Sequence, residues 1–173
     1  MSKGLVIVNT GKGKGKTTAA MGQAVRFLGH GGDVACIQFI KGKWPTGEQC
    51  LPEVFGERFY LFRQGEGFTW DRQNPESDRK MAQATWEIAK NALLSGKYGM
   101  VIWDEINIVL RYNYLNVNDV LEVLKEKASK VHVILTGRDC PEEIVAIADQ
   151  VTDMRDVKHP YRAGVKAQKG IEF

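Results

Sequence analysis

Apolar residues in this chain gather in short runs that alternate with longer stretches of mixed polarity. Five runs are short and rich in β-branched or aromatic residues, which predicts buried strands. They span residues 5–8, 33–39, 58–62, 100–103 and 131–135. Three longer stretches repeat apolar residues at the spacing of a helix face. They span residues 16–28, 75–94 and 118–127. Pro141, followed by two glutamates, predicts the first turn of another helix, with a last strand after it. This alternation indicates an α/β fold with a mostly parallel sheet and helices on both faces.

The composition is that of one ordinary globular domain. The 173 residues are 43% hydrophobic and 26% charged, and the formal net charge is +3. A chain of this length buries about 70% of the surface that its unfolded form exposes, so its core needs neither a disulfide nor a metal. No apolar run is long enough to span a membrane, and the start MSKGLVIVNT lacks an export signal. We expect a single soluble domain over residues 1–173, in the cytoplasm, with no membrane partner.

The clearest motif is a glycine- and lysine-rich loop between the first predicted strand and the first predicted helix. It reads TGKGKGKTT over residues 10–18. The glycines let successive backbone N–H groups converge on one point, and the start of the helix adds partial positive charge, which is typical of a phosphate-binding loop. Lys16 supplies a full charge and Thr17 a hydroxyl for Mg²⁺. The strict pattern has glycine where this chain has Thr10, and the alternative interpretation is a solvated turn before a helix.

An acidic pair, Asp104 and Glu105, directly follows the predicted strand 100–103. A carboxylate at the end of a buried strand can reach Mg²⁺ through water, which is the second half of a P-loop nucleotide site. Glu105 can polarise a water molecule or complete the metal shell. The alternative is that one of the two acids only caps a helix beginning near Ile106. Together with the loop, the pair predicts a P-loop fold of the RecA-like type.

Over nearly its whole length the chain resembles the P-loop ATP:corrinoid adenosyltransferases, which make adenosylcobalamin from cob(I)alamin and ATP. The segments that carry the resemblance are TGKGKGKTTAA at 10–20, QFIKGKWPTGE at 38–48, GFTW at 67–70, WDEIN at 103–107, LTGR at 135–138 and the tail VKHPYRAGVKAQKGIEF at 157–173. The loop alone is generic, whereas GFTW and the tail in this order are selective. The family loop also has threonine at the position of Thr10.

The resemblance implies that Co(I) attacks C5′ of the ATP ribose and that the whole triphosphate leaves. ATP and a corrinoid would be the substrates, Mg²⁺ the cofactor, a reductase the source of electrons for Co(II), and a homodimer the assembly. Arg26 matches an arginine near the nucleotide, one or two turns along the first helix. Metal ligands would be Thr17, Asp104 and Glu105. The residues expected on the phosphates are Gly11, Lys12, Gly13, Lys14, Gly15, Lys16, Thr17 and Thr18, although Lys12 and Lys14 can equally be solvated.

Phe68 and Trp70 occupy the positions where family members close aromatic groups beneath the corrin ring. Removing the lower axial ligand makes Co(II) easier to reduce, so the resemblance places these two residues with Lys16 in the catalytic machinery. Gly65 and Gly67 flank the segment and would let it move. The alternative is that both rings only pin the loop to the core.

Two other functions fit part of the pattern. A P-loop ATPase or small-molecule kinase would use the same loop, with Glu105 activating water and Arg138 stabilising the transferred phosphate. A nucleic-acid-binding module would use the lysines and aromatic residues, but the net charge of +3 is modest and the aromatic residues are too localised for a strand-binding groove. We therefore expect no nucleic-acid partner.

Overall fold

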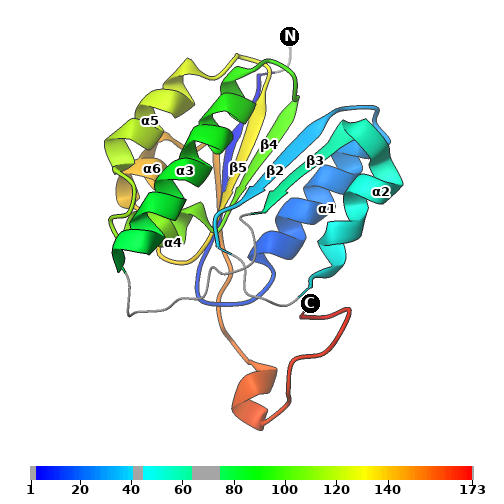
Figure 1. The fold of residues 1–173 in the computed structure, drawn as a ribbon. Coiled ribbons are helices and arrows are strands. Elements are labelled where there is room, and N and C mark those ends of the chain that lie inside the picture. The colour runs from blue at the N-terminus through cyan, green and yellow to red at the C-terminus, as the bar shows by residue number, and fades with distance from the viewer. Residues whose placement is uncertain (1–2, 41–44, 64–74, 173) are drawn as a thin grey trace.

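Six parallel strands form the central sheet of the computed structural model, which describes residues 3–40, 45–63 and 75–172 (Figure 1). Neighbours in the sheet follow the order β3-β2-β4-β5-β1-β6, and each pair is parallel. The strands are β1 (Val6–Thr10), β2 (Val34–Gln38), β3 (Phe59–Arg63), β4 (Met100–Asp104), β5 (His132–Thr136) and β6 (Gln150–Asp153). Every residue of β2 and β4 is buried, as short apolar runs in a covered parallel sheet should be.

Helices cover both faces of this sheet, as the sequence predicts (Figure 1). One face packs against α1 (Lys16–Gly29) and α2 (Leu51–Phe55) through a core that includes Ala20, Ala24 and Leu28. The other packs, through a larger core, against the other four α-helices of the described residues. These are α3 (Pro75–Leu94), α4 (Ile106–Arg111), α5 (Val117–Glu126) and α6 (Glu142–Ile147).

Two parts of the fold differ from the sequence prediction. Helix α6 begins at Glu142, and Pro141 is the residue before its first turn rather than a member of it. Helix α2 was not predicted, because five residues with Pro52 among them are too few to show a helical period. The tail from residue 158 contains one 3₁₀ turn, Pro160–Ala163, that projects below the carboxyl edge of the sheet (Figure 1).

Trp103 holds strand β4 in place next to the acidic pair. Its side chain is fully buried and meets the ring of Trp86 edge to face, with the centroids 5.1 Å apart. Its Nε1 donates to the Ala89 carbonyl at 3.2 Å, so the one polar atom of the ring is satisfied. Because Trp103 is anchored to α3 in this way, the following residue, Asp104, is held at the carboxyl end of the strand.

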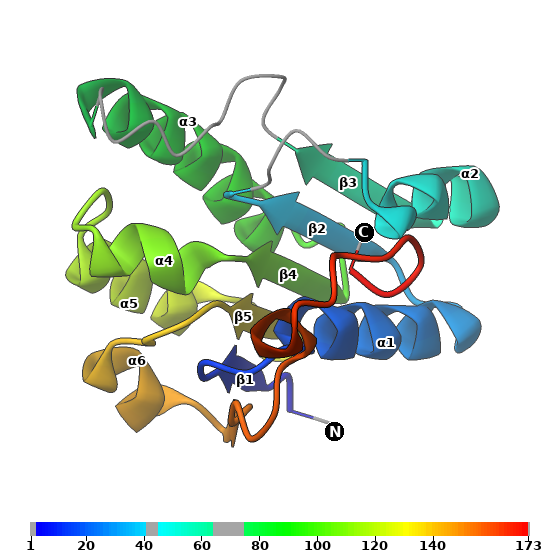
Figure 2. The ribbon, with the colours of Figure 1, turned by 90° about the horizontal axis from the view of Figure 1, so that it is seen from below.

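The carboxyl ends of all six strands meet at one edge, which Figure 2 shows face on. Ligands of open parallel sheets bind at this edge, where loops leave the strands. None of the helices within residues 3–40, 45–63 and 75–172 is both long and apolar enough to cross a membrane.

Candidate functional site

The loop of residues 11–15 wraps around the ammonium group of Lys16. Nζ of Lys16 donates to the carbonyl oxygens of Gly11 at 2.9 Å and Gly13 at 2.6 Å, and the side chain is almost completely buried. Gly15, at φ 106°, turns the chain into α1, whose first residue is Lys16. Burial lowers the pKa of Lys16, opposed chiefly by the negative charge of Glu105. A bound phosphate would stabilise this ammonium, since an anion offsets the charge that burial disfavours.

The segment that follows β6 lies directly against the phosphate loop. Gly13 N donates to the Met154 carbonyl at 2.6 Å, and Met154 N donates to the Thr10 carbonyl at 2.9 Å. A Cβ on Gly11 would come within 2.5 Å of the Met154 carbonyl oxygen. The loop therefore needs glycine for close approach as well as for its backbone angle of +99° at Gly11.

Gly11→Ala should lower the free energy of unfolding by about 1–3 kcal/mol, because alanine is strained at this backbone angle and collides with a backbone carbonyl. Urea unfolding without nucleotide measures the change. Gly22→Ala is the matched control in the same helix–loop unit, since nothing lies within 4 Å of a Cβ there. That control should be neutral or stabilising by about 0.5–1 kcal/mol. Equal effects of the two substitutions would contradict the close approach.

Asp104 is completely buried and accepts hydrogen bonds from side chains of other elements. Thr17 Oγ1 donates to its Oδ1 at 2.8 Å, and Thr136 Oγ1 donates to the same oxygen at 2.7 Å. Gln38 Nε2 donates to Oδ2 at 3.2 Å and reaches Glu48 Oε1 at 3.4 Å. The carboxylate is thereby held against the first turn of α1, beside the phosphate loop, as the motif predicted.

Whereas Asp104 is the last residue of β4, Glu105 lies between β4 and α4. Its φ of 65° is unusual for a residue other than glycine, and its backbone N donates to Thr136 Oγ1 at 2.9 Å. The residue precedes α4, which begins at Ile106 as expected, but its side chain makes no capping hydrogen bond to that fully described helix. The alternative that Glu105 only caps the helix is therefore wrong. Its side chain lines the same cavity as Lys16.

These groups surround a cavity of about 510 Å³ over the phosphate loop. The loop and the start of α1 line one part of it, and α4 with Arg138, the second residue after β5, lines another. The C-terminal segment closes a third side, where Figure 2 shows it crossing the carboxyl edge near α1. The lining residues are Gly13, Lys14, Gly15, Lys16, Thr17, Thr18, Ile40, Glu105, Ile108, Arg111, Tyr112, Arg138, Ile171 and Glu172.

Three of the residues predicted on the nucleotide, Gly11, Lys12 and Arg26, do not line this cavity, although the Gly11 carbonyl accepts from Lys16. Lys12 is exposed and lines a separate cavity of about 770 Å³ with Asp153, Arg155 and Arg162. Arg26 is exposed in the last turn of α1. Ten residues of helix separate it from Lys16, which corresponds to roughly 15 Å and nearly three turns, not one or two. Within one chain, the structure does not bring Arg26 to the phosphate loop.

Other predicted residues lie outside the part of the chain that the structure describes. Phe68 and Trp70 are among them, together with the glycines that flank their segment. Their proposed position beneath a corrin ring stays a prediction.

Sequence reasoning missed several contributors to the site, and two of them come from distant parts of the chain. Thr136 links Asp104 to the backbone of Glu105; it lies in the LTGR segment and at the end of a buried strand, but neither signal gave it a role. Glu172 forms an ion pair with Lys14 from the far end of the chain. Neither period nor motif spacing could place the tail over the loop.

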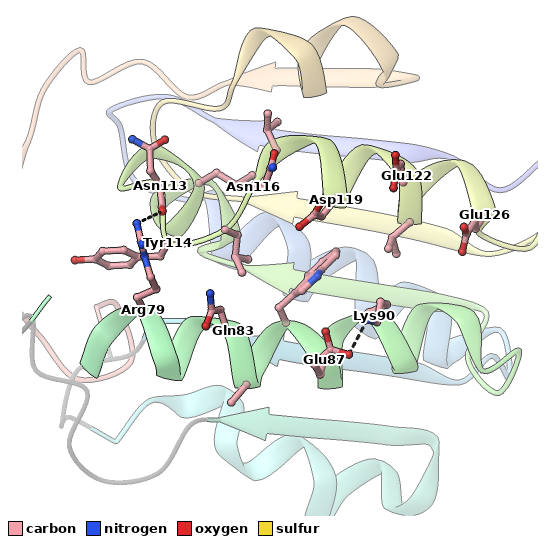
Figure 3. A pocket seen from close by; sticks show the side chains of 16 residues that line it. Arg79, Gln83, Glu87, Lys90, Asn113, Tyr114, Asn116, Asp119, Glu122 and Glu126 are labelled. Carbon is pink, nitrogen blue, oxygen red and sulfur yellow. Dashed lines mark hydrogen bonds and ion pairs between the residues drawn. The ribbon is translucent and has the colours of Figure 1, made fainter. Parts of the chain in front are cut away.

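A larger cavity lies elsewhere, in a groove of about 1040 Å³ between α3 and α5 (Figure 3). Glu87, Asp119, Glu122 and Glu126 line it and outnumber its two basic residues, Arg79 and Lys90. Such a surface repels a triphosphate, so size alone does not identify the nucleotide site.

A phosphate loop between the first strand and first helix, with a buried acid at the end of a nearby strand of an all-parallel sheet, defines a P-loop nucleotide-binding protein of the RecA-like type. The chain belongs to the family described as ATP:corrinoid adenosyltransferase BtuR/CobO/CobP, whose model matches residues 2–173. The family resemblance inferred from the motifs is therefore confirmed. The activity is transfer of the adenosyl group of ATP to a corrinoid in cobalamin biosynthesis.

Curated relatives agree with the family match. A corrinoid adenosyltransferase of Sinorhizobium is 50% identical over 173 residues, which is 99% of this chain and 81% of the relative. The corrinoid adenosyltransferases of Escherichia coli K12 and Salmonella typhimurium LT2 are 46% and 44% identical, each over 99% of this chain and 86% of the relative. A solved structure of the RadB recombinase matches 79% of this chain and 62% of its own, with a TM-score of 0.43 and 19% identity, too distant to add to what the strand order shows.

Proposed function

We propose that the phosphate-loop cavity holds the triphosphate of ATP as a leaving group while Co(I) of the corrinoid attacks C5′ of the ribose. The cobalt–carbon bond forms as the C5′–oxygen bond breaks, and inorganic triphosphate departs with that electron pair. The observation that carries the proposal is the loop curled around Lys16, with Lys14 and Arg138 on the same cavity. Three cations and the loop amides can stabilise the charge that develops on the departing oxygen.

Mg²⁺ fits the oxygen groups at this site. The Thr17 hydroxyl, the Asp104 carboxylate and the Glu105 carboxylate are hard donors, which Mg²⁺ prefers, and Thr17 and Asp104 are already 2.8 Å apart. No cluster of three His, Cys, Asp or Glu side chains able to hold a metal occurs within the described ranges, so phosphate oxygens would have to complete the shell. When bound, the ion would neutralise part of the triphosphate charge.

The product of ATP separates this function from its rival. We expect inorganic triphosphate when ATP, Mg²⁺ and chemically reduced cobalamin are supplied, together with the absorption change of a cobalt–carbon bond. Phosphorus NMR distinguishes triphosphate from ADP and phosphate. The rival ATPase or kinase reaction has one supporting observation, since Arg138 lines the cavity where a transferred phosphate would lie. ADP and phosphate as the sole products would overturn adenosyl transfer.

A double substitution, Phe68→Ala with Trp70→Ala, tests the aromatic segment. We expect the variant to lose most activity when the assay starts from Co(II), because the lower ligand would no longer be excluded, and to keep most of it when Co(I) is supplied chemically. The measurement is the fraction of activity that the variant retains when the assay starts from Co(II), compared with the fraction that it retains from Co(I). Equal losses in both would show that the rings act only as packing residues.

The finer assignments of assembly, partner and location are part of the same proposal. A homodimer is supported by the exposed edge strand β6, where Val151 is 41% exposed, since an open strand edge can pair with another chain. Analytical ultracentrifugation measures the assembly.

A reductase is supported by the chemistry, because Co(II) has to gain one electron before it can attack. The need for ATP and for an electron donor favours the cytoplasm, and cell fractionation tests that location.

A further inference from the structure

The last described turn of the chain places an acid on the phosphate loop. The backbone N–H groups of Ile171 and Glu172 both donate to the Gln168 carbonyl, at 3.2 and 2.8 Å. Gly170, at φ 81°, provides the left-handed residue that reverses the chain there. The turn directs the Glu172 carboxylate onto Nζ of Lys14, where the two form an ion pair. An anionic group of the chain itself thus lies beside the phosphate loop.

This acid contrasts with the rest of the tail. Residues 155–172 contain five lysines and arginines but only two acids, Asp156 and Glu172. Asp156 is paired with Arg162 within the tail at 2.6 Å. Glu172 instead faces the cavity, with its side chain only 18% exposed. The tail as a whole is basic, so its net charge does not attract it to the lysine-rich loop. The ion pair with Lys14 depends on the position of the Glu172 carboxylate.

An N–H group of Lys14 that donates to the Glu172 carboxylate cannot at the same time donate to a phosphate oxygen. Both Lys14 and Glu172 line the cavity that contains Lys16 and Thr17. A triphosphate that reaches from Lys16 to Lys14 brings a second anionic group to an ammonium already paired with Glu172. Binding of the triphosphate and docking of the tail on Lys14 are then competing events.

We propose that Glu172 competes with the triphosphate for Lys14 and thereby promotes the departure of inorganic triphosphate after adenosyl transfer. The inference rests on the proposed function of the cavity. ATP is held by its adenosine as well as its phosphates, but the product triphosphate is held by the phosphate contacts alone. As a phosphate oxygen leaves Lys14, the Glu172 carboxylate takes over the ammonium, so release does not leave a cation without its counter-ion.

Glu172→Gln removes the competing charge and keeps the shape of the side chain. Because Lys14 is partly exposed, its pair with Glu172 is worth little, and we expect Mg-triphosphate to bind the variant about two- to fivefold more tightly than the unchanged protein. Its dissociation should slow by a similar factor. Calorimetry gives the dissociation constant, and inhibition of adenosyl transfer by added triphosphate gives a second measure.

Two further variants separate the proposal from general charge effects. Glu57→Gln makes the same change of charge in the exposed turn before β3, at the opposite edge of the sheet, and should leave triphosphate binding unchanged. Lys14→Ala should weaken binding, and Glu172→Gln should then add nothing, because the competed cation is gone. Unchanged or weaker triphosphate binding by Glu172→Gln would overturn the proposal and make the tail a cover that helps to hold the ligand.

The proposed function and this inference fail in different ways. If the unchanged protein binds neither ATP nor triphosphate, the phosphate cavity is assigned wrongly. The same conclusion follows if the Lys16→Ala variant binds both ligands as tightly as the unchanged protein binds them. If Lys16→Ala loses binding while Glu172→Gln equals the unchanged protein, only the competition is wrong. Tail release gives an independent readout, since triphosphate should speed tryptic cleavage after Lys169, three residues before Glu172.

Discussion

Lys16→Ala should lower kcat/KM for ATP by roughly 10²- to 10³-fold, the usual effect of removing one preorganised group that stabilises developing charge. The ammonium of Lys16 is almost fully buried and held by the Gly11 and Gly13 carbonyls, so it is fixed at the centre of the loop before any ligand arrives. The loss should be equal with Co(II) and with chemically reduced Co(I), because it concerns ATP rather than the corrinoid. Steady-state assays with both corrinoid forms measure it.

Comparison with other lysines sharpens this prediction. Lys14→Ala should cost less, since Lys14 is partly exposed, and Lys12→Ala least, since Lys12 lines the neighbouring cavity. Lys130→Ala, an exposed lysine in the turn before β5, is the charge-matched control and should change nothing. Equal losses for Lys12 and Lys16 would mean that net charge, not the geometry of the loop, attracts ATP.

Asp104→Asn should lower activity by roughly 10²-fold, a size typical of losing one fixed charge in an enclosed site. An asparagine keeps the volume but replaces one acceptor oxygen with a donor. Either that donor faces Gln38 Nε2, or it faces the hydroxyls of Thr17 and Thr136. One buried group is then left unsatisfied, which should lower the free energy of unfolding by about 1–3 kcal/mol.

Two measurements separate the loss of metal binding from the loss of stability. Urea unfolding without nucleotide gives the change in the free energy of unfolding. Nucleotide titrations with Mg²⁺ and with EDTA give the increase in nucleotide affinity that Mg²⁺ causes, and this increase should be smaller in the variant. Glu122→Gln on the exposed face of α5 carries the same charge change and should behave like the unchanged protein. A variant that gains as much from Mg²⁺ as the unchanged protein would refute Asp104 as a metal ligand.

The strands and long helices could be predicted from sequence because each rests on a local pattern. Helix α3 begins and ends at the predicted residues 75 and 94, and β2 and β4 coincide with apolar runs to within a residue. A strand of a parallel sheet is covered on both faces, so nearly all its side chains are apolar, and a continuous apolar run identifies it. Helix α2 escaped because it is short and stabilised by packing of Leu51 and Phe55 against the sheet.

The nucleotide site was predictable for a similar reason. A phosphate loop works through backbone N–H groups and a helix start that lie within one contiguous segment, so residues 11–18 reveal it without knowledge of distant parts. The partner acid Asp104 could be found because strands in a parallel sheet end at a common edge. Arg26 was misplaced because a match of residue type along a helix does not say which end of that helix faces the ligand.

Residues close together along the chain were enough to predict the α/β class, the phosphate loop, the acid at the end of β4 and the family. The three-dimensional structure was needed to show which lysines face the cavity, that Thr136 and Gln38 hold Asp104, and that Glu172 reaches Lys14 from 158 positions away. Those contacts join separate strands and an irregular tail. Their free energies depend on distances in space, which the spacing of residues along the chain does not encode.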